Sequence, residues 1–181
     1  MEERKVYLSL GSNIGDRESN LAQATMALSI NFDISDITSS SYYDTSPLYN
    51  EDQPNFLNSV VRFKTKLKPF DILDIAQKVE KMLGRPTPRL KNQPRIIDID
   101  ILFHGDAIIE TDELILPHPM IAFRKFILIP FAEIEPEFQI PHSNMYIKDL
   151  IKHCPDTSAV RKHQMDIQAW KIYTISQSKV Q

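Results

Sequence analysis

The chain has 181 residues, of which 42% are hydrophobic, so it is long enough for one globular domain with a buried core. Its formal net charge of −3 argues against a broad nucleic-acid interface, and its single cysteine, Cys154, excludes an internal disulfide and a cysteine-built zinc site. We find no signal peptide and no apolar run of membrane-spanning length, so we expect a cytoplasmic protein with no nucleic-acid or membrane partner.

The first 65 residues predict a strand, a helix and two more strands. Residues 5–10 form a strand-like run that stops at Gly11, and Asp16 is placed to cap a helix that continues to about residue 30. Residues 34–43 and 56–65 have strand character and are separated by a loop with two prolines.

Glycine and proline divide the second half of the chain. Pro69 suits the first turn of a helix that ends before Gly84, and residues 85–94 form a cationic, proline-rich loop. Residues 96–103 predict a strand, followed by a hairpin that passes through Gly105 to residues 114–116. Beyond it, prolines are expected to break the chain into short helical pieces: Pro117, Pro119 and Pro130.

The order strand-helix-strand-strand-helix-strand predicts an α+β fold, a ferredoxin-like sandwich in which helices lie on one face of a mainly antiparallel sheet. We expect one domain over residues 1–155. Residues 156–181 are polar and are expected to form a C-terminal extension rather than a separate domain. We expect a monomer.

Two acids lie inside the apolar strand at residues 96–103. Asp98 and Asp100 are two apart, so they share one face of the strand, and the isoleucines between them share the other. Mg²⁺ is commonly held by one or two carboxylates together with substrate phosphates, which makes this pair a candidate metal site. The alternative is an edge strand whose acids face solvent and keep it soluble.

Basic side chains flank the acidic strand. Arg85, Arg95 and Arg124 could supply guanidinium groups, and His118 an imidazole, near the two acids. Guanidinium groups bind phosphate oxygens in bidentate fashion, so the group describes a polyphosphate site. For Arg85 and Arg95 taken singly, a solvated loop cation is the more ordinary alternative.

Two further patterns have weaker functional interpretations. Residues 11–15 follow a strand and open a helix, but they lack a complete phosphate-loop motif, so a tight turn with capping is the better interpretation. Gln77 and Glu80 share one helix face and could contact a nucleotide, although solvent exposure on an amphipathic helix is the stronger alternative.

A polar side chain and two aromatic ones could bind a heterocycle. Asn58 is unfavourable inside a strand unless its amide finds partners, and an amide that both donates and accepts suits the edge of a heterocyclic ring. Phe56 and Phe126 could stack on such a ring, although core packing is the commoner role of phenylalanine.

These motifs together resemble the 6-hydroxymethyl-7,8-dihydropterin pyrophosphokinase family of folate biosynthesis. The resemblance spans about residues 5–141 and depends on the order and spacing of the motifs rather than on any one of them. The motifs are Gly11-Ser12-Asn13, Tyr43 to Leu48, Asp52 to Asn58, Gly84-Arg85, Pro94 to Leu102, Pro117-His118, Arg124 and Phe126.

The resemblance implies a transferase that moves the β,γ-pyrophosphoryl group of ATP to the hydroxymethyl oxygen of 6-hydroxymethyl-7,8-dihydropterin and releases AMP. It implies two Mg²⁺ ions held by Asp98 and Asp100, which with Arg85 and Arg95 form the catalytic group. The implied ATP-binding residues are Gln77, Arg85, Arg95, Ile101, Ile115, His118 and Arg124. The implied pterin-binding residues are Thr45, Ser46, Leu48, Phe56, Asn58, Asp98 and Phe126.

The chain departs from the family pattern in the loop at residues 85–94. Asn92 stands where many members have a tryptophan, and Arg89 or Lys91 is expected to replace a missing charge. In the family this loop acts as a lid that excludes water.

Two rival functions stay open on the residues alone. One is a different Mg²⁺-dependent nucleotidyl or phosphoryl transferase, which would bind ATP and ignore pterin. The other is a noncatalytic ferredoxin-like binding module, for which the acids would be dispensable.

Overall fold

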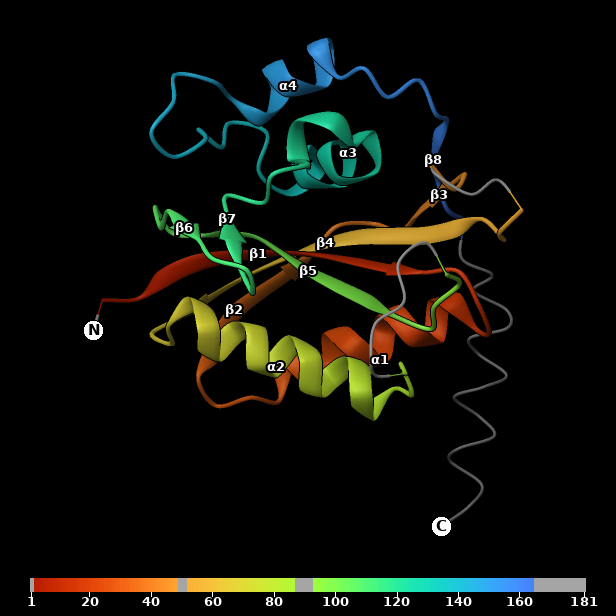
Figure 1. Cartoon of the computed structure of the whole chain (residues 1–181), viewed down its shortest axis with the longest axis horizontal. Coiled ribbons are helices and arrows are strands. Elements are labelled where there is room, and N and C mark those ends of the chain that lie inside the picture. Colours follow the sequence, from red (N-terminus) through yellow and green to blue (C-terminus); the bar gives the residue numbers. More distant parts are fainter. Residues whose placement is uncertain (1, 49–51, 87–92, 165–181) are drawn as a thin grey trace.

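A computed structural model describes residues 2–48, 52–86 and 93–164. At its centre is a six-stranded antiparallel sheet in the order β5-β1-β4-β3-β8, in which β2 also pairs with β4 (Figure 1). The strands are β1 (Arg4–Ser12), β2 (Ile34–Ser39), β3 (Tyr43–Thr45), β4 (Phe56–Thr65), β5 (Asp98–His104) and β8 (Val160–Lys162). The predicted α+β class with a mainly antiparallel sheet is confirmed.

The single strand predicted over residues 34–43 is wrong, because the chain forms two strands there. Ser39 at the end of β2 lies opposite Val61, and Tyr43 at the start of β3 lies opposite Asn58. The segment between β2 and β3 therefore has one more residue than the part of β4 that it faces. Ser40 fills the break, since its hydroxyl accepts a hydrogen bond from the Val60 N–H at 3.0 Å. The extra residue sets β3 apart from β2 on the same partner strand.

Two helices cover one face of the sheet (Figure 1). Helix α1 (Arg17–Ser29) is capped as predicted, with Asp16 Oδ1 accepting from the Ser19 N–H at 3.0 Å. Helix α2 (Pro69–Met82) ends just before Gly84, whose φ of +93° suits glycine. Alternate residues of β1, β4 and β5 pack against these helices in the first core, which includes Leu8, Leu10, Leu21, Val61, Ile72, Ile99 and Ile101.

The opposite face of the sheet is also covered, which the predicted order of strands and helices did not include. Helices α3 (Lys125–Ile134) and α4 (Ile147–His153) lie there, with the 3-10 turn η1 (Ile121–Phe123) before them. Pro130 lies inside α3, so the predicted break at this proline is wrong. Pro130 is buried, and the other buried residues of α3, Ile127, Leu128 and Phe131, belong to this second core, whose packing outweighs the lost backbone hydrogen bond.

A hairpin ends at residues 115–116, but its first strand is not the one predicted at residues 96–103, and it lies apart from the main sheet. Strand β6 (Ile109–Glu110) pairs with β7 (Ile115–Leu116) as a separate two-stranded sheet. The predicted C-terminal extension includes β8, which pairs with β3. Within residues 2–48, 52–86 and 93–164, no helix combines the length and the apolar character that crossing a membrane requires.

Candidate active site

The strand pairing brings the predicted polar residues onto one face at one end of the sheet. Asp98 of β5 lies opposite Gly11 of β1, and Gly11 lies opposite Asn58 of β4. Asn58 lies opposite Tyr43 of β3, and the neighbouring pair on this face is Thr45 with Phe56. Directly opposed residues point to the same side of a sheet, so a carboxylate and an amide flank a glycine on one surface.

Gly11 keeps the centre of this row open. A Cβ at residue 11 would lie 2.9 Å from Asn58 Oδ1 and 3.9 Å from the Phe56 ring. The Asn58 side chain is buried, and its Nδ2 donates to Thr45 Oγ1 at 2.7 Å. The amide therefore has the partner that its place in a strand requires, and its orientation is fixed.

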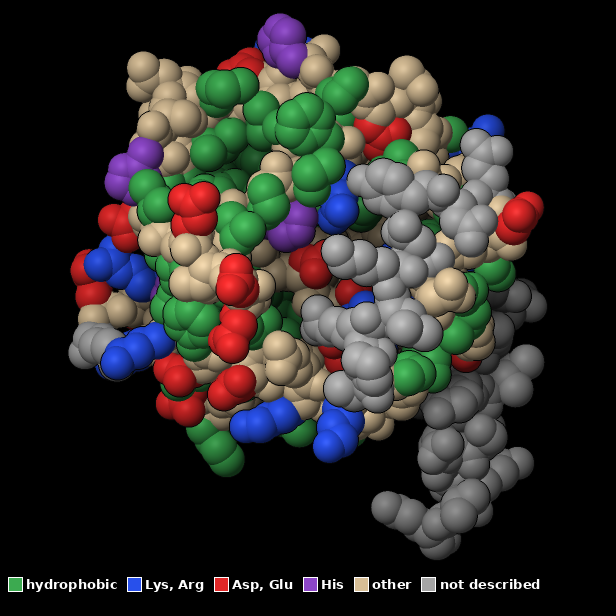
Figure 2. Space-filling view, in the orientation of Figure 1, with side chains coloured by type: hydrophobic (Ala, Val, Ile, Leu, Met, Phe, Trp, Pro, Cys, Tyr) green, Lys and Arg blue, Asp and Glu red, His purple; other side chains and the backbone are tan. Residues whose placement is uncertain are grey.

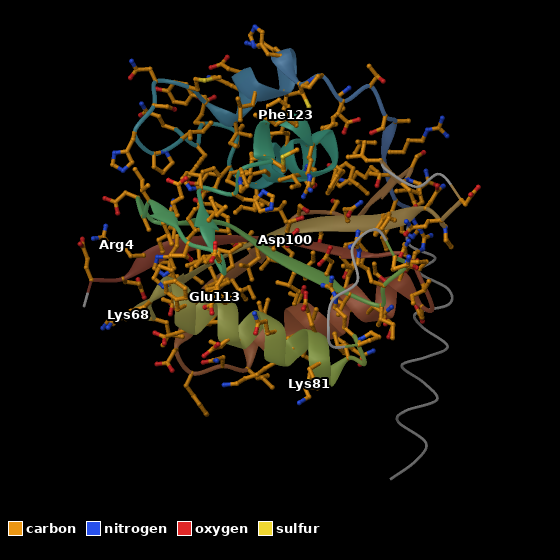
Figure 3. The ribbon with its side chains drawn as sticks, viewed as in Figure 1. Arg4, Lys68, Lys81, Asp100, Glu113 and Phe123 are labelled. Atoms are coloured by element: carbon orange, nitrogen blue, oxygen red, sulfur yellow. The ribbon has the colours of Figure 1, made fainter. Side chains whose placement is uncertain are left out.

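The two acids face the side of the sheet that carries α3. Ile99 and Ile101 between and beyond them belong to the first core, as the strand alternation predicts. Strand β5 is an edge strand of the described sheet, but its acids are not simply solvated: the Asp98 side chain is 20% exposed and that of Asp100 is 34% exposed. Figure 3 shows Asp100 on β5, between the layer of α2 and that of α3.

Two arginines meet at Asp98. Arg85 Nη1 forms an ion pair with Asp98 Oδ1, and Arg95 Nη1 lies 3.2 Å from Asp98 Oδ2. The Arg85 side chain is only 8% exposed. Burial disfavours its charge, but the carboxylates of Asp98 and Glu80 outweigh burial and raise the pKa of Arg85. The alternative of solvated loop cations is therefore wrong for both arginines.

Glu80 of α2 supports the ion pair between Arg85 and Asp98. It is a site residue for which the sequence favours solvent exposure. It is 3% exposed, and its Oε1 lies 2.5 Å from Arg85 Nη1 and accepts from the Ile99 N–H at 2.8 Å. The signal was its position four residues after Ala76, on the apolar face of the helix. Gln77 is exposed on the same helix, as the stronger alternative predicted.

His118 and Arg124 approach the acids from the segment that leads into α3. The His118 N–H donates to Leu102 O at 3.0 Å, and its Nδ1 accepts from the Met120 N–H at 3.2 Å, so the neutral ring carries its proton on Nε2. Burial, together with the charge of Arg124, lowers the pKa of His118 to about 4. Arg124 Nη1 lies 4.0 Å from Asp100 Oδ2. Figure 2 shows acidic, basic and histidine side chains gathered near the middle of this face.

Each of the two predicted stacking phenylalanines is half-buried and lies beside a site arginine. The Arg95 Cζ is 5.1 Å from the centre of the Phe56 ring, and the Arg124 Cζ is 5.8 Å from that of Phe126. Phe126 also packs against the second core, so the core alternative holds for it in part. Among the residues that the structure describes, the buried Nε atoms of Arg95 and Arg124 have no hydrogen-bond partner.

The other predicted residues differ in their exposure. Ser46, Leu48 and Ile115 are exposed, and Ile101 is buried in the first core. The tight turn at residues 11–15 has the predicted capping, with no complete phosphate-loop motif. Arg89, Lys91 and Asn92 of the predicted lid lie outside the described residues.

The known proteins that are similar to this chain in sequence point to one family. The sequence profile of the 7,8-dihydro-6-hydroxymethylpterin-pyrophosphokinase (HPPK) family matches residues 7–136. A 2-amino-4-hydroxy-6-hydroxymethyldihydropteridine pyrophosphokinase of Bacillus subtilis is 46% identical over 128 residues, which cover 71% of this chain and 76% of the relative. The Haemophilus influenzae protein of the same name is 34% identical over 155 residues, covering 86% of this chain and 96% of the relative.

Other relatives are longer proteins. The folate synthesis bifunctional protein of Arabidopsis thaliana is 42% identical over 130 residues, but the match covers only 27% of its length. Among solved structures, an HPPK-DHPS in complex with substrates has a TM-score of 0.65 at 16% identity, covering 84% of this chain and 43% of that one. This structural likeness supports the fold, and the chain spans less than half of the solved protein.

Proposed function

The chain belongs to the HPPK family and is a pyrophosphokinase of folate synthesis, and we propose that it works with ATP and Mg²⁺ at the face formed by Asp98, Asp100 and the surrounding arginines. The reaction joins the hydroxymethyl oxygen of 6-hydroxymethyl-7,8-dihydropterin to the β-phosphorus of ATP. The bond from that phosphorus to the oxygen on the α-phosphorus breaks, and AMP leaves. The observation that supports this proposal most is that Arg85 and Arg95 both form ion pairs with Asp98, one of the two acids.

The acid pair fits Mg²⁺. Asp98 and Asp100 provide oxygen ligands on one strand face, and Mg²⁺ takes its remaining ligands from phosphates and water. When bound, Mg²⁺ would neutralise the charge that develops on the phosphates. Arg85 and Arg95 neutralise Asp98 in this structure, so we propose that they move their hydrogen bonds to phosphate oxygens when ATP binds.

The remaining residues would position the two substrates. Arg124 and His118 would donate to the phosphates, since the Arg124 Nε has no partner among the described residues and the His118 Nε2 carries its proton. Asn58 and Thr45 would recognise the pterin edge between the rings of Phe56 and Phe126. Chemistry of this kind depends on positioning and electrostatics, and we name no general base.

The site assignment is tested by the product and by the metal requirement. Incubation with ATP, Mg²⁺ and 6-hydroxymethyl-7,8-dihydropterin should release AMP rather than ADP, and chelation of Mg²⁺ should abolish it. Asp100→Asn should lower turnover by at least about 100-fold, because it removes a charged metal ligand. Asp33→Asn, at an exposed acid before β2, is the control. ADP as product, or wild-type turnover in Asp100→Asn, would contradict the proposal.

A second experiment separates this function from a transferase that ignores pterin. Pterin binding is titrated with and without a nonhydrolysable ATP analogue and Mg²⁺. Binding that requires the nucleotide supports a shared site, whereas no pterin binding under either condition contradicts it. The cytoplasmic location, the monomeric state and the domain boundary at residue 155 stay predictions of the sequence.

A further inference from the structure

His163, which follows β8, connects two carboxylates from different elements. Its Nδ1 lies 2.5 Å from Asp44 Oδ2 on β3, and its Nε2 lies 2.8 Å from Glu18 Oε1 on α1. An ionised carboxylate can only accept, so the imidazole donates from both nitrogens and carries a positive charge. Its side chain is 17% exposed. Burial disfavours this charge, but the hydrogen bonds to Glu18 and Asp44 prevail and raise the pKa of His163.

Asp44 extends this connection, through Arg17, to the residue that precedes β4. Its second oxygen, Oδ1, accepts from Arg17 Nη1 at 3.0 Å, and the same Nη1 donates to Asn55 O at 3.0 Å. Asn55 directly precedes Phe56. The chain of contacts from His163 through Asp44 and Arg17 therefore ends at the backbone next to a proposed pterin ring partner.

The same cluster cannot touch the pterin itself. Thr45 and Tyr43 lie on the site face of β3, so the Asp44 side chain between them points to the opposite face. The backbone adds to the attachment, since the His163 N–H donates to Tyr42 O at 2.8 Å and β8 pairs with β3 along its length. The family profile ends at residue 136, so this attachment lies beyond the part that the family match covers.

We infer that His163 is a positioning residue for the pterin subsite. Through Asp44 and Arg17 it fixes the position of β3 relative to the start of β4. Without it, Asp44 and Glu18 lose their shared cation, and the spacing between Thr45 on β3 and Phe56 on β4 is less well fixed. The proposed Mg²⁺ ligands on β5 and the proposed phosphate-binding residues before α3 lie outside this chain of contacts, and Arg95 meets it only at the Phe56 ring. The inference rests on the proposed function, because the subsite it concerns is that of the pterin.

The test measures pterin binding and kinetics in His163→Ala. We expect the Kd and KM for pterin to rise about tenfold, the equivalent of one charge-assisted hydrogen bond, with kcat and the KM for ATP changed less than about threefold. Pterin binding is measured with the nonhydrolysable ATP analogue and Mg²⁺ present. His163→Gln, whose amide retains donors, should fall between wild type and His163→Ala, and it serves as the second variant if the alanine variant does not fold.

Lys162→Ala is the matched control on the same strand. It removes the 3.0 Å ion pair with Glu133 and leaves the Asp44 cluster in place, so we expect the pterin Kd to stay at the wild-type value. An equal rise in Lys162→Ala, or an unchanged pterin Kd in His163→Ala, would overturn the positioning role while leaving the proposed function intact. Failure of the wild-type protein to bind pterin would overturn both.

Discussion

Asn13 exchanges two hydrogen bonds with Arg95, although 82 residues separate them in the sequence. The Asn13 N–H donates to Arg95 O at 3.1 Å, and its Oδ1 accepts from the Arg95 N–H at 2.7 Å. Its Nδ2 donates to Gln53 Oε1 at 3.1 Å, and the residue is 1% exposed. One buried amide therefore fixes both the residue that leads into β5 and the loop that leads into β4.

We predict that Asn13→Ala destabilises the protein by about 1–3 kcal/mol, because it leaves the part-buried Arg95 N–H without its acceptor. It should also lower kcat/KM, since Arg95 contacts Asp98. Urea unfolding and steady-state kinetics provide the two measurements. Asn13→Asp keeps the acceptor and loses the donor to Gln53, so it should retain more activity than Asn13→Ala, and equal losses would contradict the role given to the Arg95 contact.

Glu80 offers a prediction about stability at the same site. Glu80→Ala removes one member of a buried ion pair and the acceptor for the Ile99 N–H. Breaking a buried pair by removing one partner costs about 3–5 kcal/mol, because the remaining charge has lost its compensation. Urea unfolding should show this loss. Glu80→Gln keeps an acceptor for Ile99 and should lose less, whereas a loss below about 1 kcal/mol in Glu80→Ala would show that Asp98 alone compensates Arg85.

The regular part of the fold could be predicted because local patterns and packing agree there. Strand β4 was predicted with its observed bounds, and the Asp16 cap and the stop before Gly84 are set by residues close in sequence. The split between β2 and β3 could not be predicted, because it depends on the register with β4. The helix break predicted at Pro130 is wrong for a related reason: packing of the buried face of α3 overrides the local tendency of proline to end a helix.

The candidate site was predictable in its residue types more than in its contacts. The spacing of Asp98 and Asp100 placed them on one face, as observed. The support from Glu80 could not be predicted, because acids on an amphipathic helix usually face solvent, and this one is buried on the apolar face. The contact of His163 with Asp44 spans 119 residues, and no local pattern indicates such a pair.

His118 and His163 should respond to pH in opposite directions. The pKa of His118 falls from 6.5 to about 4 on folding, so the unfolded state binds more protons between these values. The stability that depends on neutral His118 is present above pH 6.5 and is lost as the pH falls toward 4. Relative to His118→Gln, the wild-type free energy of unfolding should drop by about 1–3 kcal/mol across this range.

The measurement is urea unfolding of both proteins at several pH values, so that other acid-sensitive groups cancel in the difference. His163 is the control of opposite sign: its pKa is raised, so its contribution is present below pH 6.5 and is lost as the pH rises through the raised value. A wild-type minus His118→Gln difference that is flat between pH 4 and 6.5 would contradict a buried neutral His118.

Gly11→Ala tests whether the open position between Asp98 and Asn58 is needed for the pterin subsite. The added Cβ would lie 2.9 Å from Asn58 Oδ1, so the amide must move away from Thr45 Oγ1 or the strands must separate. We expect a pterin KM raised about tenfold or more and a stability loss of about 1–3 kcal/mol. In Gly11→Ala/Asn58→Ala the clash is gone, so the combined stability loss should be smaller than the sum of the two single losses. Strict additivity in urea unfolding would mean that the methyl group and the amide do not collide.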